Sequence, residues 1–193
     1  MNIAVIKYNA GNIHSVRLAL RRLGVEPVVT DEIQVLKSAD KVIFPGVGEA
    51  SSAMRYIRDR GIADLLPQLT QPVLGICLGL QLMCRASEEN ASRCLRIFNT
   101  AVRRFPANDK VPHMGWNKIH NLKGDLFRNV QSAAFVYFVH SYYAELNPLT
   151  VATTDYILLF SAALQRDNFY AVQFHPEKSG AVGEQILRNF LAL

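Results

Sequence analysis

A cysteine in a glycine-flanked turn is the first candidate for chemistry in this sequence. Residues 74–81 read Leu-Gly-Ile-Cys-Leu-Gly-Leu-Gln, so glycines stand two positions before and two after Cys77. The apolar run predicts a strand, and an amphipathic helix is expected from residue 80 to about 84, which is the nucleophile-elbow pattern with cysteine in place of serine. A thiol at a helix N-terminus is favoured as the thiolate. We therefore expect Cys77 to be a nucleophile, with the amide of Leu78 directed at an oxyanion. An ordinary buried cysteine has the same local pattern, so a base is needed to decide.

The segment 170–177, Tyr-Ala-Val-Gln-Phe-His-Pro-Glu, supplies such a base. Its alternating apolar residues predict a strand that His175 ends, and Pro176 stops the strand. An imidazole can take the proton of a thiol, and Glu177 can hold the second ring nitrogen. Taken alone, His175 could be a structural histidine and Glu177 a solvated turn carboxylate. Together with the elbow they predict a catalytic triad of Cys77, His175 and Glu177.

Metal and cofactor sites are the main chemical alternatives, and the spacing does not favour them. The sequence has no Cys-x-x-Cys and no His-x-x-x-His, and Cys77, Cys84 and Cys94 lack the paired spacing that zinc prefers. No phosphate-binding glycine loop of the usual patterns is present. We therefore predict no metal and no cofactor. Cys84, seven residues after Cys77, is expected in the core.

The composition bounds the class of protein. The chain has 193 residues, of which 50% are hydrophobic and 19% charged, which suits one soluble domain over residues 1–193. No apolar run reaches the roughly 18 residues of a membrane helix, and the first seven residues are too short an apolar stretch for a signal peptide. Three cysteines are too few for a disulfide framework, which favours a reducing, cytoplasmic setting.

The net charge of +5 raises the question of nucleic acid. The basic residues fall in small groups without interleaved aromatic residues, and no nucleic-acid motif is present. We interpret them as solvated helix faces or as a docking face for an acidic partner.

The elements that must position these residues alternate along the first eighty residues. Strands are predicted at 3–8, 25–30, 41–44 and 73–76. Helices are predicted from Ile13 to Leu23, over 33–38, and from residue 50 to about 69. This alternation predicts an α/β fold with a mostly parallel open sheet flanked by helices and right-handed crossovers. The pattern loosens over 86–112. Short strands are then expected at 135–139, 151–154, 161–165 and 170–174, followed by a closing helix, and additional antiparallel strands are expected in this C-terminal half.

The two motifs together resemble the triad-type, class-I glutamine amidotransferases, which have a flavodoxin-like fold. The resemblance covers nearly the whole chain, because further segments occur in order: Tyr8-Asn9-Ala10-Gly11-Asn12, Pro45-Gly46-Val47-Gly48, Pro112-His113-Met114-Gly115-Trp116-Asn117, Phe138-Val139-His140-Ser141-Tyr142 and Gln173 to Gly180. The second and third of these are typical of one branch of the family. In that branch the chain forms a heterodimer with a (β/α)₈-barrel cyclase subunit.

The resemblance implies a thioester mechanism. Cys77 would attack the side-chain amide of glutamine while His175 moves the proton and Glu177 orients the imidazole. Ammonia would pass to the partner, and water would release glutamate from Cys77. Residues 46–48 would form an oxyanion strand, with the amide of Gly48 acting beside that of Leu78.

The resemblance also implies binding residues. Gly46, Gln81, Ser141 and Tyr142 would hold the substrate, although Gln81 as an exposed helix residue and Tyr142 as packing remain open. The partner interface would include Asn12, His113, Trp116, Asn117 and Lys178. Core packing of the sole tryptophan is the alternative for the cluster around Trp116, which lies in a loop-like stretch.

Two segments depart from the family pattern, and two other functions stay open. Arg96 stands where a glycine is expected, and residues 156–160 lack the usual glycine-containing turn, so the local loop geometry should differ there. The chain could serve another ammonia-using synthase, such as one making anthranilate or a pyrimidine nucleotide, or it could be a non-catalytic scaffold that docks a partner. The particular flanking motifs argue against the first, and the intact triad argues against the second.

Overall fold

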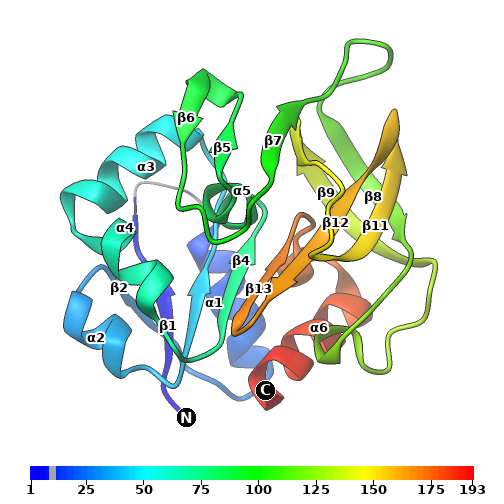
Figure 1. Cartoon of the computed structure of the whole chain (residues 1–193). Helices are drawn as coiled ribbons and strands as arrows, with labels where there is room; N and C mark the ends of the chain where they lie inside the picture. The colour runs from blue at the N-terminus through cyan, green and yellow to red at the C-terminus, as the bar shows by residue number, and fades with distance from the viewer. Residues whose placement is uncertain (9–11) are drawn as a thin grey trace.

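A large mixed sheet organises the molecule (Figure 1). The computed structural model describes residues 1–8 and 12–193. Five strands pair in parallel in the order β2-β1-β3-β4-β13. They are β1 Ile3–Ile6, β2 Val28–Thr30, β3 Lys41–Phe44, β4 Val73–Ile76 and β13 Phe169–Val172. The predicted mostly parallel sheet with flanking helices is confirmed.

The second half of the sheet is largely antiparallel, as predicted. Beyond β13 the order continues through β12, β10, β7, β5 and β6, and β11 pairs with β12. Their bounds are β5 Ala86–Ser87, β6 Ser92–Arg93, β7 Ala101–Arg104, β10 Tyr142–Ala144, β11 Thr150–Tyr156 and β12 Leu158–Arg166. Strands β8 His113–Ile119 and β9 Ala134–His140 form a separate antiparallel hairpin.

Helices cover both faces of the parallel strands. They are α1 Ile13–Arg22, α2 Ile33–Ser38, α3 Ala50–Asp59, α4 Ile62–Leu65, α5 Leu78–Met83 and α6 Gly180–Ala192. Short 3₁₀ helices lie at Leu66–Gln68, Glu89–Ala91, Asp125–Phe127 and Pro176–Lys178. No helix in the described part of the chain is long and apolar enough to span a membrane.

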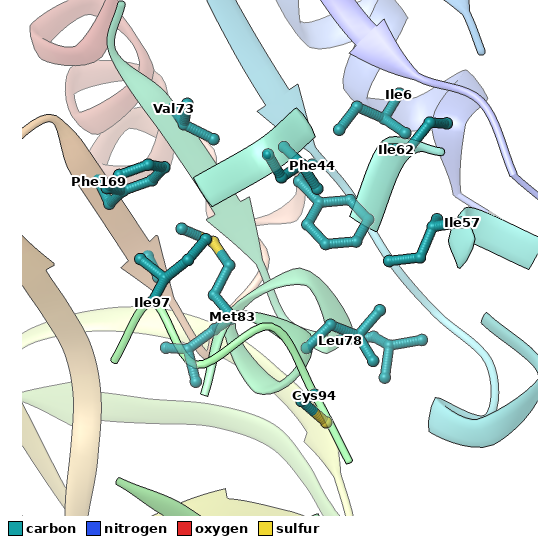
Figure 2. Packing of buried hydrophobic residues seen from close by; sticks show 14 of the residues in the cluster. Ile6, Phe44, Ile57, Ile62, Val73, Leu78, Met83, Cys94, Ile97 and Phe169 are labelled. Atoms are coloured by element: carbon teal, nitrogen blue, oxygen red, sulfur yellow. The ribbon is translucent and has the colours of Figure 1, made fainter. Parts of the chain in front are cut away.

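Alternation along the central strands divides the core into two layers. Ala4 and Ile6 of β1 belong to one apolar cluster with α2 to α5, whereas Ile3 and Val5 belong to another with α1 and α6. Figure 2 shows the first layer, in which Phe44 of β3 lies beside Ile57 and Ile62 from the covering helices. Because both faces are buried, these strands are apolar along their length apart from Lys41 at the start of β3.

Several predicted elements differ in extent. The helix expected over 50–69 ends at Asp59, and Gly61 with φ +69° separates it from α4. Helix α5 begins at Leu78, and all six of its residues are buried, so the prediction of an amphipathic helix from residue 80 was wrong. The stretch around Trp116, expected to be loop-like, is strand β8. Its polar and half-exposed residues hide the strand pattern, and pairing with β9 determines its structure.

Candidate active site

The turn at Cys77 has the geometry of a nucleophile elbow. Cys77 joins β4 to α5 with φ 52° and ψ −105°, a conformation that L-residues rarely adopt. Its N–H donates to the carbonyl of Val172 at 2.8 Å. A side chain on Gly79 would collide with the carbonyl of Phe44 on β3, so only glycine lets α5 pack this closely against the sheet. The surrounding packing therefore holds the strained turn in place.

His175 and Glu177 form a buried pair at the end of β13. His175 Nδ1 lies 2.8 Å from Glu177 Oε1, and both side chains are fully inaccessible to solvent. Asn12, at the N-terminus of α1, donates from Nδ2 to the same carboxylate oxygen. The backbone of His175 is held by the carbonyl of Tyr137 at 2.9 Å. The imidazole is thus fixed with Nδ1 toward the carboxylate.

The charge state of His175 depends on Cys77. Burial by itself would lower the pKa of His175, but the negative charge of the Cys77 thiolate and then that of Glu177 raise it to about 10. Nε2 of His175 has no hydrogen-bond partner among residues 1–8 and 12–193. The sulfur accepts a long hydrogen bond of 3.5 Å from Gln173 Nε2. A charged imidazole near the sulfur can stabilise a thiolate, which is the form of cysteine that attacks a carbonyl carbon.

The predicted oxyanion donor Leu78 is already engaged. Its N–H donates to the carbonyl of Gly46 at 3.3 Å, so that carbonyl occupies the place where a substrate oxyanion would bind. Rotation of the peptide that joins Gly46 and Val47 would replace the carbonyl with the N–H of Val47. Val47 therefore joins the predicted Gly48 as a candidate second donor. A side chain on Gly46 would meet the hydroxyl of Tyr8 and the Cβ of Leu78.

A cavity of about 220 Å³ opens beside the sulfur. The predicted residues that line it are Gly48, Cys77, Leu78, Gln81, Ser141 and Tyr142. Gln81 is only 4% exposed, and its Nε2 donates to the carbonyl of Tyr142 at 3.0 Å and to Gln173 Oε1 at 3.1 Å. It is thus part of the cavity wall, and the alternative of an exposed helix residue is wrong.

Sequence reasoning missed Glu89, which also lines the cavity. Burial raises the pKa of this carboxyl group, and one of its oxygens accepts the N–H of Ala50 at 2.8 Å. Glu88 and Glu89 lie in the stretch without periodicity, where two neighbouring acidic residues indicate only a solvated surface. No local signal could have singled out Glu89.

The predicted interface residues fall into two groups. Trp116 is 55% exposed and shares the β8–β9 hairpin with exposed Met114 and Phe135. Lys178 lies 6.0 Å from the ring centre of Tyr137 on β9. His113, by contrast, is 3% exposed, so any role at a partner surface has to be indirect.

The remaining predicted interface residues make internal bonds. Asn12 contacts Glu177, as described above, and Asn117 Nδ2 lies 3.3 Å from His113 Nε2. Asn9, Ala10 and Gly11 of the first family segment lie outside the described residues.

Both departures from the family pattern occur at left-handed backbone positions. Arg96 has φ 60° and Ile157 has φ 63°, so each side chain occupies a conformation that glycine adopts without strain. Cys84 is buried, as predicted. Within the described residues, no cluster of three or more His, Cys, Asp or Glu could hold a metal ion.

Comparison with known proteins gives consistent matches. The family profile described as "Glutamine amidotransferase class-I" matches residues 4–193. The chain is 61% identical over 196 residues to imidazole glycerol phosphate synthase subunit HisH of Bacteroides fragilis, and 44% identical over 198 residues to the HisH subunit of Salmonella typhimurium. Both alignments cover 100% of each chain. A solved structure described as a glutamine amidotransferase superposes with a TM-score of 0.77 at 18% identity, covering 98% of this chain and 97% of the other.

Proposed function

Because this chain belongs to the class-I glutamine amidotransferases, and within them to the HisH subunits of imidazole glycerol phosphate synthase, we propose that Cys77, His175 and Glu177 are its catalytic triad. The chain is the glutaminase subunit of that synthase, an enzyme of histidine biosynthesis. The observation that carries the triad assignment is the fully buried His175–Glu177 pair, with Nδ1 and Oε1 2.8 Å apart, together with the strained elbow conformation of Cys77.

The reaction begins with attack on glutamine. The Cys77 thiolate adds to the carbonyl carbon of the side-chain amide, and negative charge develops on the carbonyl oxygen. His175 gives its proton to the leaving nitrogen, so that ammonia departs and a γ-glutamyl thioester remains on Cys77. A water molecule then attacks the thioester while His175 accepts its proton, and glutamate leaves with the thiolate restored. Glu177 keeps the imidazole oriented in both steps.

The oxyanion hole is the regulated part of this proposal. Leu78 donates to Gly46 in the structure described here, so the tetrahedral oxygen can be stabilised only after the Gly46–Val47 peptide rotates. Leu78 then acts with Val47, or with Gly48 as the sequence predicted. Such a hole keeps the free subunit slow, since the loss of even one donor lowers kcat roughly 10²- to 10³-fold and the closed hole offers neither donor.

Substrate recognition uses the walls of the cavity. Gln81, Ser141 and Tyr142 hold the α-substituents of glutamine, whereas Gly46, also predicted to bind substrate, is not among the residues that line the cavity and acts through the orientation of its peptide. We add Glu89 to the predicted set, because a carboxylate on the cavity wall suits the α-ammonium group.

The partner in this proposal is the (β/α)₈-barrel cyclase subunit, in a heterodimer in the cytoplasm. The exposed face of the β8–β9 hairpin docks it through Trp116, with Met114 and Phe135 beside it. Asn12, Asn117 and Lys178 contribute near this face, and His113 supports it from within. Ammonia then passes to the cyclase for the formation of imidazole glycerol phosphate and AICAR.

The test is glutamine hydrolysis measured with and without the cyclase subunit and its nucleotide ligand. We expect slow hydrolysis by the free chain and a rise of roughly 10²-fold or more in the complex, because recovery of even one oxyanion donor has an effect of that size. Equal rates would contradict the closed hole and the coupling. Ammonia delivery to a different synthase would instead favour the alternative of another pathway, and absence of hydrolysis in the complex would favour the scaffold.

A further inference from the structure

Two buried histidines outside the triad face each other across the β8–β9 hairpin. His113 and His140 are register partners on these strands, and His113 Nδ1 lies 3.1 Å from His140 Nε2. They are 3% and 6% exposed. Aromatic rings surround them, from Phe105, Phe138, Tyr156 and Phe160. Ring nitrogens in such a shell need hydrogen-bond partners, and these partners decide which nitrogen of each histidine carries the proton.

One end of the pair is fixed by Asn117. Its Oδ1 accepts the N–H of Lys118 at 2.8 Å, and its Nδ2 donates to the carbonyl of Asp155 at 3.0 Å, which sets the orientation of the amide. The same Nδ2 lies 3.3 Å from His113 Nε2. His113 Nε2 is therefore an acceptor, and the proton of His113 sits on Nδ1, from which it is donated to His140 Nε2.

The other end leads to the same proton assignment independently. His140 Nδ1 lies 2.7 Å from the carbonyl oxygen of Tyr142, which can only accept. His140 therefore carries its proton on Nδ1 and accepts at Nε2. Burial lowers the pKa of His113 to about 4 and that of His140 to about 3, so both rings are neutral at neutral pH. Hydrogen bonds then run in one direction, from Asn117 through His113 and His140 to Tyr142.

The Tyr142 carbonyl belongs to the wall of the glutamine cavity. It also accepts from Gln81 Nε2 at 3.0 Å, and His140, Ser141 and Gln81 line the same cavity. Gln81 continues to Gln173 Oε1 at 3.1 Å, and Gln173 Nε2 donates to Cys77 Sγ at 3.5 Å. The series of hydrogen bonds thus reaches from β8 to the thiol.

We propose that His113 and His140 are positioning residues that tie the glutamine-binding wall to the exposed face of the β8–β9 hairpin. We call Asn117, His113, His140 and Tyr142 the imidazole relay. Asn117 follows Trp116 on β8, and its side chain lies on the opposite face of the strand from that of Trp116. A partner seated on Trp116 therefore acts on Asn117 through the backbone that the two residues share, and from there on the Tyr142 carbonyl through two imidazoles. The relay rests on the proposed function, since it requires a partner on the hairpin. Aromatic packing alone does not require nitrogen atoms in the shell, because phenylalanine would fill it without burying polar groups.

Two substitutions at His113 separate a positioning role from packing. His113→Phe fits the aromatic shell but donates nothing to His140. His113→Asn fills the space less well but places an amide N–H near the position of Nδ1. Both variants are assayed as the complex with the cyclase subunit, with glutamine as the nitrogen source, and thermal unfolding is measured in parallel. Tyr156→Phe, which keeps the ring stacked on His113 and every bond of the relay, is the matched control.

We expect His113→Phe to lower kcat/KM for glutamine on the order of tenfold, mainly by raising KM, which is what loss of one hydrogen bond amounts to. His113→Asn should recover most of this loss despite a lower unfolding temperature, and Tyr156→Phe should match the wild type. Activity with an ammonium salt in place of glutamine should stay unchanged in all variants, because the cyclase is intact.

The opposite order of activities would overturn the relay. If kcat/KM follows thermal stability, with His113→Phe equal to the wild type and His113→Asn impaired, the pair serves packing alone. A wild-type chain that gains no activity from the cyclase would instead contradict the proposed function. A responsive wild type with an unaffected His113→Phe variant would remove the relay and leave the proposed function intact.

Discussion

Two histidine sites in this protein are both buried, but the imidazole of one is charged and the imidazoles of the other are neutral. In the triad, His175 lies 2.8 Å from Glu177, and its pKa is raised to about 10. In the hairpin, His113 lies 3.1 Å from His140, and their pKa values are lowered to about 4 and about 3. Burial favours the neutral ring at both sites. Only the triad has a thiolate and a carboxylate to oppose it.

The difference shows how one fold uses imidazole for two purposes. A charged ring beside a thiolate can give up a proton, which suits catalysis. A neutral ring accepts a hydrogen bond at one nitrogen and donates one from the other, so it fixes the relative positions of its two partners, which suits positioning. Changes at each site should therefore affect different measurements.

The largest expected effect comes from removing the thiolate. Cys77→Ala should lower glutamine hydrolysis in the complex by roughly 10⁴-fold or more, because the nucleophile is lost. Ammonium-dependent synthesis and binding of the cyclase should be retained. Cys94→Ala is the matched control, since burial raises the pKa of that thiol to about 11 and it lies outside the cavity. An active Cys77→Ala variant would remove the nucleophile assignment.

The carboxylate of the triad should matter less than the thiol. Glu177→Gln keeps the shape of the side chain but removes the charge that orients the imidazolium, and we expect kcat to fall on the order of 10²- to 10⁴-fold. Steady-state glutaminase assays of the complex measure this. Glu184→Gln, which alters an exposed pair with Arg188 on α6, should behave as the wild type. Equal loss in both variants would point to general destabilisation.

Stability against pH should separate the two sites by sign. The pKa of His175 is raised above its ordinary value of 6.5. The contribution of His175 to the free energy of unfolding is therefore complete below about pH 6.5 and is lost as the pH rises toward 10. The pKa values of His113 and His140 are lowered, so their contribution is lost as the pH falls from about 6.5 toward 4 and 3.

Chemical denaturation at several pH values tests this separation. Cys77→Ala should flatten the alkaline side of the stability profile, because it removes the main cause of the raised pKa. His113→Phe should flatten only the acid side. If Cys77→Ala changed the acid side of the stability profile instead, or His113→Phe the alkaline side, the assignment of the two charge states would be wrong.

The smallest expected effect is at the turn beside the neutral pair. Ile157 is a β-branched residue at φ 63°, next to Tyr156, whose ring stacks 4.0 Å from that of His113. Ile157→Gly relieves the left-handed strain of about 1–2 kcal/mol, partly offset by the flexibility of glycine, so the free energy of unfolding should rise by up to about 1 kcal/mol. Denaturant unfolding measures this change, and glutaminase activity should stay the same. A loss of stability would mean that packing of the Ile157 side chain outweighs the strain.

The sequence predicted the parts of the site that depend on local chain chemistry. The elbow around Cys77 needs small residues at fixed spacing, and His175 and Glu177 are only two residues apart, on either side of Pro176. Each of these two features can therefore be recognised in a short stretch of sequence. The parallel strands were predicted for the same reason, because burial on both faces makes them continuously apolar. The triad roles themselves stay predictions until the variants are measured.

Features that depend on pairing between distant segments could not be predicted. Glu89 reaches the cavity through the short strands β5 and β6, which have no periodic signal. His113 was expected at an interface because the resemblance to the family places its segment there, and its burial follows from the register of β8 against β9. The engagement of Leu78 by Gly46 depends on one peptide orientation that no residue type specifies.

Because of the hydrogen bond between Leu78 and Gly46, two kinds of cysteine reagent should label Cys77 of the free subunit at different relative rates from Cys77 of the complex. An alkylating agent displaces a halide and develops no oxyanion, so it has no need of the closed hole. A glutamine-like aldehyde must form a tetrahedral hemithioacetal, whose oxygen requires the donor that Gly46 now occupies. Comparison of the two labelling rates would therefore report the orientation of a single peptide in solution, without any turnover of substrate.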